Sequence, residues 1–364
     1  MILIAAAVFV VCVTAAACIV FCKFRRGPRD SGEDDVDIIS PKVTRTQTNP
    51  STASGAYYSA RSVPGIIDSS VAVPTWEGQL VQSLNADQEL VNGRIDPTML
   101  QYETVMTVGA FEIWKCCYND TTVVSAKMLL PQNRHSMHEV NLFVEEIKLS
   151  LSLSHPNIVY FLGVTWTSLD DLCLVMEYHE RGDLQTILQH QGNKLTWSND
   201  KLHIALGLAR ALMYLHGRPS QILHRDIKAK NVLVTNSFVA KLGEFGGSRH
   251  QVDATMTGGP GAAFWAAPEV LQGLQYSEKA DMYSFGVLLN ELDTCTVPFQ
   301  SYRSTMQPIE IIRHIMGGSL QLHFSPSCPP RVFTIAQACL AVPAEERPRA
   351  HEVVTQLEQI LWRT

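Results

Sequence analysis

A change of hydrophobic periodicity near residue 180 constrains the fold more than any other feature of this chain. Before it, apolar residues alternate in short runs typical of β-strands, and beyond residue 183 they recur at helical spacing. Strands followed by helices predict an α+β fold with a small β-rich N-lobe, a larger helical C-lobe and a cleft between them. The predicted strands are 100–108, 111–118, 121–129, 158–166 and 171–178, and the predicted helices are 79–90, 138–153, 204–215, 281–292, 332–340 and 351–362.

The composition argues against a nucleic-acid-binding protein and against a scaffold held by disulfides or a structural metal. The 364 residues are 46% hydrophobic and 18% charged, and the formal net charge is −6, so the basic excess typical of nucleic-acid-binding proteins is absent. The nine cysteines form no CxxC pair and no metal-ligand spacing with histidine. We therefore expect reduced thiols, no structural metal and no nucleic-acid partner.

The first 22 residues carry no charged side chain and are almost wholly apolar. As a helix they would span about 33 Å, close to the roughly 30 Å hydrocarbon core of a bilayer. Lys23, Arg25 and Arg26 follow at once, and basic residues on this flank predict an N-terminus outside and a cytosolic remainder. The alternative is a cleaved secretory signal, but a signal has a basic n-region and an apolar run of only about 7–15 residues. The flanks favour a single-pass transmembrane helix over 1–22 that anchors the protein in a membrane.

Serine, threonine, proline, glycine and acidic residues dominate the stretch that follows. Regular apolar periodicity is missing there until about Leu80, so we predict a largely disordered juxtamembrane linker over 23–97. From residue 98 to 364 the chain has the pattern of one domain. Its N-lobe is expected over about 98–178 and its C-lobe over about 181–364.

Residues suited to phosphoryl transfer lie close together after residue 223. Asp226, Lys228 and Asn231 bring a carboxylate, an ammonium and an amide into one short loop, and Glu244 with Phe-Gly after it comes 13 residues later. Phosphoryl transfer needs a base near the attacking hydroxyl, a cation on the moving phosphate and oxygen ligands for Mg²⁺. These residues therefore predict phosphotransfer chemistry, with glutamate where that chemistry usually has aspartate.

From about residue 100 to its end, the chain resembles the eukaryotic-type protein kinases, and within them the tyrosine-kinase-like group of serine/threonine kinases. The resemblance implies ATP and Mg as cofactors. It implies that Asp226 takes or orients the proton of the substrate hydroxyl and that Lys228 neutralises charge on the γ-phosphate. Asn231 and Glu244 would hold the Mg²⁺ ion.

The same resemblance implies a nucleotide site in the cleft. Lys127 matches the strand lysine that contacts the α- and β-phosphates, and Glu146 matches its helix partner. Met176 matches the gatekeeper, and the backbone of Glu177 and His179 would face adenine. The remaining residues implied to bind ATP are Gly109, Ile113, Ser125 and Leu233.

Four departures from the family pattern concern catalysis. In the glycine loop, Thr107 stands for the first glycine, Gly109 remains and the third glycine is deleted. Ser125 stands where alanine is usual, and Ala262 where a threonine is common. Glu244 carries one methylene too many, which moves its carboxylate by about 1.5 Å. A misplacement near 1 Å costs roughly a hundredfold in rate, so we expect a slow enzyme.

Other matches concern the activation segment and its support. Thr255 and Thr257 are candidate phosphorylation sites, and Arg225 is a candidate partner for the added phosphate. Glu269 is expected to form a buried ion pair with Arg347. Asp281 is expected to hold the loop that contains Arg225.

Two functions remain open from the residues. The first is a membrane-anchored serine/threonine kinase that acts on a protein substrate. The second is a pseudokinase, a scaffold or an allosteric partner for another kinase. The intact residues Lys127, Glu146, Asp226, Lys228 and Asn231 favour the kinase. A receptor for outside ligands is disfavoured because almost nothing precedes the predicted span, and the sequence gives no prediction of the substrate, the pathway or the oligomeric state.

Overall fold

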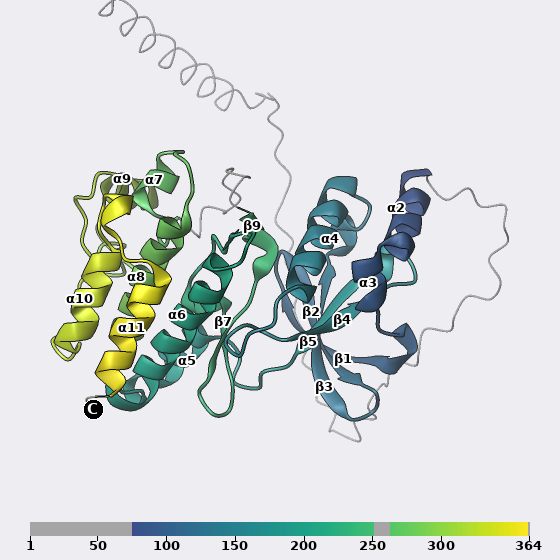
Figure 1. Ribbon diagram of the computed structural model, residues 1–364, viewed down its shortest axis with the longest axis horizontal. Helices are drawn as coiled ribbons and strands as arrows, with labels where there is room; N and C mark the ends of the chain where they lie inside the picture. The colour runs from purple at the N-terminus through teal and green to yellow at the C-terminus, as the bar shows by residue number, and fades with distance from the viewer. Residues whose placement is uncertain (1–74, 251–262, 363–364) are drawn as a thin grey trace, which may run out of the picture. The chain divides into compact units, whose positions relative to one another are not determined.

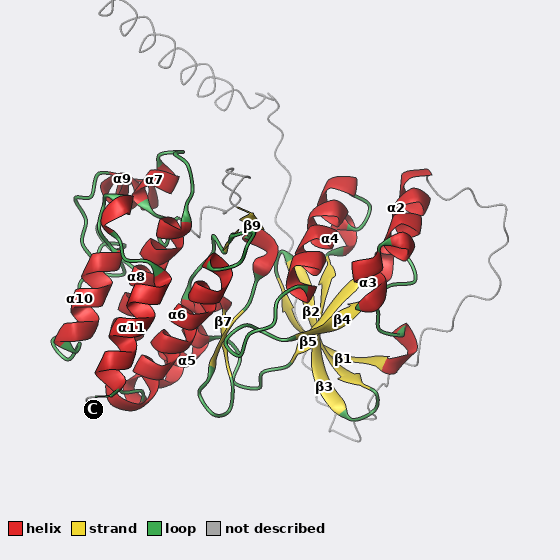
Figure 2. Ribbon diagram, in the orientation of Figure 1, coloured by secondary structure: helices red, strands yellow, loops and turns green. Residues whose placement is uncertain are grey.

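The computed structural model describes residues 75–250 and 263–362. These belong to one compact unit, which contains a lobe built on a β-sheet and a lobe built of helices (Figure 1). Figure 2 shows the long strands gathered in the first lobe and the helices from α5 onward in the second. The two-lobed α+β arrangement predicted from the periodicity is therefore confirmed.

The N-lobe sheet has five strands in the order β1-β2-β3-β5-β4, and each neighbouring pair is antiparallel. Asn119 and Asp120 form the turn between the second and third strands with φ angles of 50° and 56°, as a tight hairpin turn requires. The strands are β1 (Leu100–Val108), β2 (Phe111–Tyr118), β3 (Thr122–Leu129), β4 (Phe161–Thr165) and β5 (Cys173–Glu177).

Helix α4 (Met137–Leu151) packs against this sheet. Ser136 caps its N-terminus by accepting a hydrogen bond from the backbone N–H of Glu139. The buried face of the helix includes Phe143, Ile147 and also Glu146. A glutamate on the apolar face of a helix needs a partner inside the protein, because an unpaired buried charge is costly.

Residues 75–97 are packed against the N-lobe. Helices α2 (Thr75–Ala86) and α3 (Gln88–Asn92) bury Leu84 and Leu90 in the main hydrophobic core. Asp87 lies 2.6 Å from Lys148 of α4, and the segment after α3 continues the sheet beyond β4 through the hydrogen bond from Ile95 N to Val164 O. Residues 75–97 thus belong to the same compact unit as the two lobes.

An arginine secures this N-terminal segment. The guanidinium of Arg94 lies 4.1 Å from the ring centroid of Trp166 and donates a hydrogen bond to the carbonyl of the same residue at 2.8 Å. Asn85 accepts hydrogen bonds from Arg94 and from the indole of Trp166. Gly163 is required close by, because a Cβ there would lie 2.4 Å from the carbonyl oxygen of Gly93.

The described part of the C-lobe consists of helices and two short antiparallel strand pairs, β6 with β9 and β7 with β8. The predicted helical spacing over 204–215 is confirmed, since Ile204, Leu208, Leu212 and Leu215 are buried in one core. The C-lobe elements are α5 (Leu184–Gln191), α6 (Leu202–His216), β6 (Ile222–Leu223), β7 (Val232–Val234), β8 (Ala240–Leu242), β9 (Arg249–His250), α7 (Pro268–Leu271), α8 (Glu278–Thr294), α9 (Pro308–Met316), α10 (Pro330–Cys339) and α11 (Ala350–Leu361).

The predicted transmembrane helix and single-pass localisation are corrected. Across 75–250 and 263–362, no helix is both long and apolar enough to cross a membrane. The longest among them, α8, has 17 residues, fewer than the roughly 20 that a span needs, and carries buried acidic residues. The segment for which the span was predicted, 1–22, lies outside the described residues.

Candidate active site

Lys127 lies at the centre of a buried charge cluster in the N-lobe. Its ammonium is 2.5 Å from Glu146 Oε1 and 3.1 Å from Glu244 Oε2. The side chains of Lys127 and Glu146 are only 2% and 3% exposed, whereas that of Glu244 is 47% exposed. Burial alone would lower the pKa of Lys127, but the two carboxylates raise it above its ordinary value, so the lysine stays charged.

Three separate elements bring these groups together. Lys127 lies on β3, Glu146 on α4 and Glu244 before the short 3₁₀ turn Phe245–Gly247. Glu244 has a φ of 61°, a left-handed conformation that non-glycine residues rarely adopt. Glu244 therefore contacts Lys127 from a left-handed backbone conformation.

Phe245 and Gly246 fit the turn to its surroundings. The buried ring of Phe245 packs edge-on against Phe161 of β4 and His224, at centroid distances of 5.9 and 5.0 Å. A Cβ at Gly246 would lie 3.1 Å from Glu146 Oε2, so glycine allows the turn to approach α4 closely. The turn therefore joins the N-lobe cluster to the loop that contains His224.

Asp226, Lys228 and Asn231 converge as the sequence suggested. The ammonium of Lys228 lies 2.8 and 2.7 Å from the two carboxylate oxygens of Asp226. The amide nitrogen of Asn231 donates to the backbone carbonyl of Asp226 at 2.8 Å and to its Oδ2 at 2.7 Å. Gly243 N donates to Asn231 O at 3.0 Å, which holds the segment leading to Glu244 beside this loop.

Asp281 of α8 supports the loop that contains His224 and Arg225. Its carboxylate accepts hydrogen bonds from the backbone N–H groups of His224 and Arg225 at 2.9 and 2.8 Å, and it contacts His216 and the hydroxyl of Tyr276. Burial opposes its ionisation, but the hydrogen bond with His216 leads the contacts that lower the pKa of Asp281. A charged acceptor can therefore fix two consecutive amides of the loop, including Arg225 at a φ of 67°.

Glu291 is a loop contact that the sequence interpretation missed. This buried carboxylate of α8 accepts hydrogen bonds from Ala229 N at 3.0 Å and from the indole nitrogen of Trp265 at 2.7 Å. Burial raises its pKa to about 7. The available signal was an acidic residue inside an otherwise apolar helical run, which demands polar partners.

Arg347 and Glu269 form the ion pair expected from the sequence. The guanidinium of Arg347 is 0% exposed and donates two hydrogen bonds to the Glu269 carboxylate, at 2.7 and 2.8 Å. It also donates to the carbonyl of Ala341 at 2.7 Å. Glu269 lies in the first turn of α7, so the pair fastens the end of the activation segment, which the family resemblance places over 244–269, to the C-lobe.

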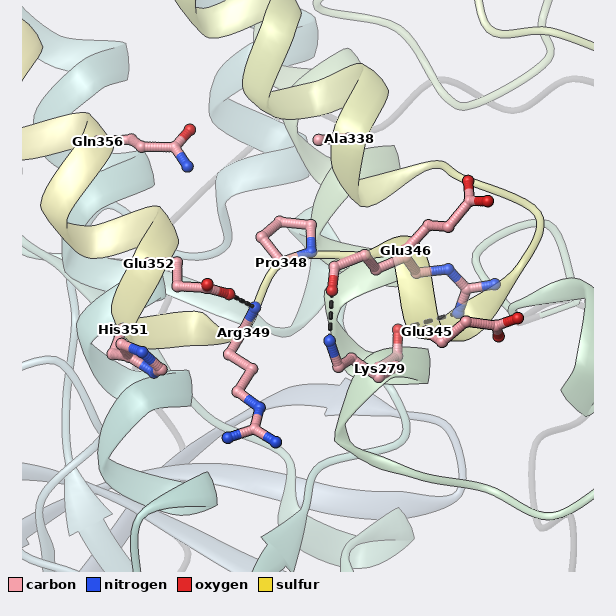
Figure 3. Close-up of a pocket in the computed structure, with 10 residues that line it drawn as sticks. Lys279, Ala338, Glu345, Glu346, Pro348, Arg349, His351, Glu352 and Gln356 are labelled. Atoms are coloured by element: carbon pink, nitrogen blue, oxygen red, sulfur yellow. Dashed lines mark hydrogen bonds between the residues drawn. The ribbon is translucent and has the colours of Figure 1, made fainter.

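A polar pocket lies beside this pair (Figure 3). The ammonium of Lys279 donates to the carbonyl of Arg347, and Arg349 N donates to Glu352 at 2.6 Å. None of the residues lining this pocket is among the predicted catalytic or ATP-binding residues.

Three predicted nucleoside contacts, Ser125, Met176 and Glu177, lie on the paired strands β3 and β5. Ser125 and Met176 are cross-strand partners, as are Val124 and Glu177, on β3 and β5. Burial opposes ionisation of Glu177, but the contacts of its carboxylate with His179 at 3.4 Å and Lys241 at 2.7 Å contribute to a pKa lowered to about 2. The same carboxylate accepts a hydrogen bond from Tyr160 N at 2.7 Å, which helps to hold the end of β5 in place.

The remaining predicted nucleotide contacts come from three elements. Ile113 of β2 pairs with Lys127 across the sheet, and Leu233 lies on β7. Gly109 occupies the turn between β1 and β2, where a Cβ would meet no atom within 4 Å. Close packing therefore does not require glycine at this position, and the open surroundings are consistent with a shortened hairpin.

Two predicted sites cannot be placed. Thr255 and Thr257 lie outside the described residues, as does Ala262. Within the described residues, no three side chains of histidine, cysteine, aspartate or glutamate converge to hold a metal. A site that combines Asn231 with Glu244 needs further oxygen ligands from substrate phosphate or water, which Mg²⁺ readily accepts.

Comparison with known proteins identifies the family. A family model described as protein tyrosine and serine/threonine kinase matches residues 100–357. The serine/threonine-protein kinase VIK of Arabidopsis thaliana is 33% identical over 278 residues, which cover 73% of this chain and 61% of VIK. CTR1, a serine/threonine-protein kinase of the same plant, is 32% identical over 65% of this chain and 29% of its own length.

A third relative comes from an amoeba. The protein drkB of Dictyostelium discoideum, named a probable serine/threonine-protein kinase, is 34% identical over 64% of this chain and 33% of its own length. The chain thus spans about a third to three fifths of the lengths of these relatives. The family model covers both lobes and every element of the charge clusters described above, and the chain belongs to the protein tyrosine and serine/threonine kinase family.

Proposed function

We propose that this protein is a serine/threonine protein kinase that transfers the γ-phosphate of ATP to hydroxyl groups of proteins. One observation carries the proposal: Asp226, Lys228 and Asn231 form a single hydrogen-bonded cluster in the loop before β7. A hydroxyl bound beside Asp226 would find a carboxylate for its proton and an ammonium for the transferred phosphate. The domain that carries this activity is proposed to span 98–364, with lobes over 98–178 and 181–364.

The residues present fit ATP and a divalent cation. Lys127 is a buried ammonium held by a carboxylate of α4, which suits it to the α- and β-phosphates. Asn231 and Glu244 would supply oxygen ligands to Mg²⁺, which neutralises charge on the phosphates when bound. Ser125, Met176, Glu177, His179, Leu233, Ile113 and Gly109 would surround the nucleoside and the first phosphates.

Glu244 supports a slow enzyme. Its carboxylate reaches Lys127, so the same side chain would have to turn from the lysine to hold the metal. Its longer side chain would hold that metal off its best position, and small misplacements cost large factors in rate. The alternative function, a pseudokinase that binds or regulates a partner kinase, is favoured by this same contact, because it engages the phosphate-binding lysine.

One assay separates the two functions. The full-length chain is incubated with Mg-ATP and a generic protein substrate, beside Asp226→Asn and the control Asp170→Asn, whose carboxylate lies on the surface. We expect phosphate transfer by the wild type and the control, and none by Asp226→Asn. Equal incorporation by wild type and Asp226→Asn would overturn the kinase assignment and leave the pseudokinase.

A further inference from the structure

Lys127 has a third neighbour besides the two carboxylates with which it forms ion pairs. The ring centroid of Phe111 lies 4.0 Å from its ammonium nitrogen, a distance at which a cation is attracted by an aromatic face. An ammonium has three N–H groups. Here Glu146, Glu244 and the Phe111 ring surround them.

The short hairpin between β1 and β2 determines where this ring lies. β1 ends at Val108 and β2 begins at Phe111, so only two residues separate the strands, and Phe111 already pairs with Leu129 of β3. Ile113 pairs with Lys127 in the same ladder. Because side chains two apart on a strand share a face, Phe111 projects toward the same side of the sheet as Lys127.

Two further contacts hold the ring over the lysine. Phe111 also packs against Phe143 of α4, with a centroid distance of 5.4 Å. The neighbouring Glu112 forms an ion pair with Arg134 at 3.1 Å, and Arg134 also donates a hydrogen bond to the carbonyl of Leu129. These contacts tie the hairpin to the end of β3, so the ring is built into the N-lobe.

We propose that Phe111 is a specificity-determining residue of the nucleotide site, disfavouring ligands that bring a phosphate to Lys127 relative to nucleosides that do not. The inference rests on the proposed function, because it assumes that nucleotides occupy this cleft. A phosphate oxygen must displace the ring or one carboxylate to reach the ammonium. Glu146 is deeply buried and Glu244 is half exposed, so the ring remains the barrier once Glu244 has turned away.

The test compares two ligands on one set of proteins. Full-length wild type, Phe111→Ala and Phe111→Leu are titrated calorimetrically with Mg-ATP and, separately, with adenosine. Loss of a cation–π contact in Phe111→Ala is expected to tighten Mg-ATP binding roughly 3- to 30-fold. Adenosine binding is expected to stay unchanged. Phe111→Leu keeps apolar volume against Phe143 without the aromatic face, so it should show a smaller gain for Mg-ATP, and it serves as the test variant if alanine prevents folding.

Phe333→Ala, which alters an exposed aromatic ring of the C-lobe, is the matched control and should bind both ligands as the wild type does. Equal or weaker Mg-ATP binding by both Phe111 variants overturns the inference while the proposed kinase stands. Parallel changes for Mg-ATP and adenosine also overturn it, since they indicate general loosening of the cleft. Mg-ATP binding to none of the proteins overturns the inference and the proposed function together.

Discussion

The carboxylate of Glu291 lies 2.7 Å from the indole nitrogen of Trp265. The same oxygen accepts the backbone N–H of Ala229, so one side chain of α8 joins the loop of residues 226–231 to the segment that contains Trp265. Burial disfavours its charge and raises the pKa of Glu291 to about 7. The protonated acid, which still accepts both hydrogen bonds, is therefore stabilised by folding.

This relationship predicts a specific pH dependence of stability. The pKa of the Glu291 carboxyl is about 4.5 in the unfolded chain and about 7 in the folded protein. The stability that its protonated form contributes is therefore fully present below pH 4.5 and is lost as the pH rises through 7. Between them, Glu291 should reduce the free energy of unfolding by up to about 1.4 kcal/mol per pH unit. Glu291→Gln stays neutral and should lack this loss.

Urea unfolding of the full-length chain from pH 5 to pH 8 measures the difference. Relative to the wild type, Glu291→Gln should become steadily more stable until about pH 7, and Glu345→Gln, an exposed change, should follow the wild type. Parallel curves for Glu291→Gln and wild type would contradict the raised pKa.

Glu244→Asp should raise phosphotransfer if the proposed kinase is slowed by its metal ligand. Aspartate is shorter by one methylene, so it would withdraw from Lys127 and place the carboxylate nearer its usual position. We expect a gain of several-fold and at most about a hundredfold in kcat. Steady-state kinetics with Mg-ATP measure it, and Glu345→Asp is the control. An unchanged kcat would place the limitation in the short β1–β2 hairpin instead.

Breaking the Arg347–Glu269 pair should destabilise the C-lobe strongly. Arg347→Met or Glu269→Gln leaves the other group buried without its partner, which costs about 3–5 kcal/mol. The double variant should lose less than the sum of the two, because no charge remains unpaired. Denaturant unfolding of the four proteins gives the coupling free energy, and additive losses would show that the pair contributes no coupling.

The N-terminal helices should contribute to stability through their buried side chains. Leu90 is 1% exposed and its neighbour Val91 is 40% exposed, and both lie on α3. Leu90→Ala is expected to cost about 2–5 kcal/mol. Val91→Ala should change stability by no more than about 0.5 kcal/mol. Thermal and urea unfolding compare them, and equal small effects would indicate that α3 is only loosely attached.

Local pattern predicted much of the fold. The strands at 100–108 and 111–118 have the predicted limits because alternation and the turn at Asn119 and Asp120 are local signals. The fourth and fifth strands are shorter than predicted, since pairing partners decide where a strand ends. The predicted transmembrane helix is contradicted by the finding that no helix in 75–250 and 263–362 is long and apolar enough to cross a membrane, and the segment of that prediction, 1–22, lies outside these residues.

In the candidate site, too, contacts between neighbours in the sequence could be predicted and contacts between distant segments could not. Asp226, Lys228 and Asn231 are near neighbours in sequence, and their convergence could be predicted from the motif. The contacts of Glu291 with Trp265 and of Phe111 with Lys127 could not, because they depend on the packing of α8 and on the register of a shortened hairpin.

By itself, the sequence determined the order of strands and helices and the set of acids, bases and amides available for chemistry. The pair of Lys127 with Glu146 was expected from the family resemblance. Only the tertiary structure decided that Glu244 and the Phe111 ring contact the same ammonium, and that residues 75–97 pack against the N-lobe. The physical reason is that hydrogen bonds and alternation act over a few residues. Contacts between distant segments are selected by the free energy of burying the whole core at once.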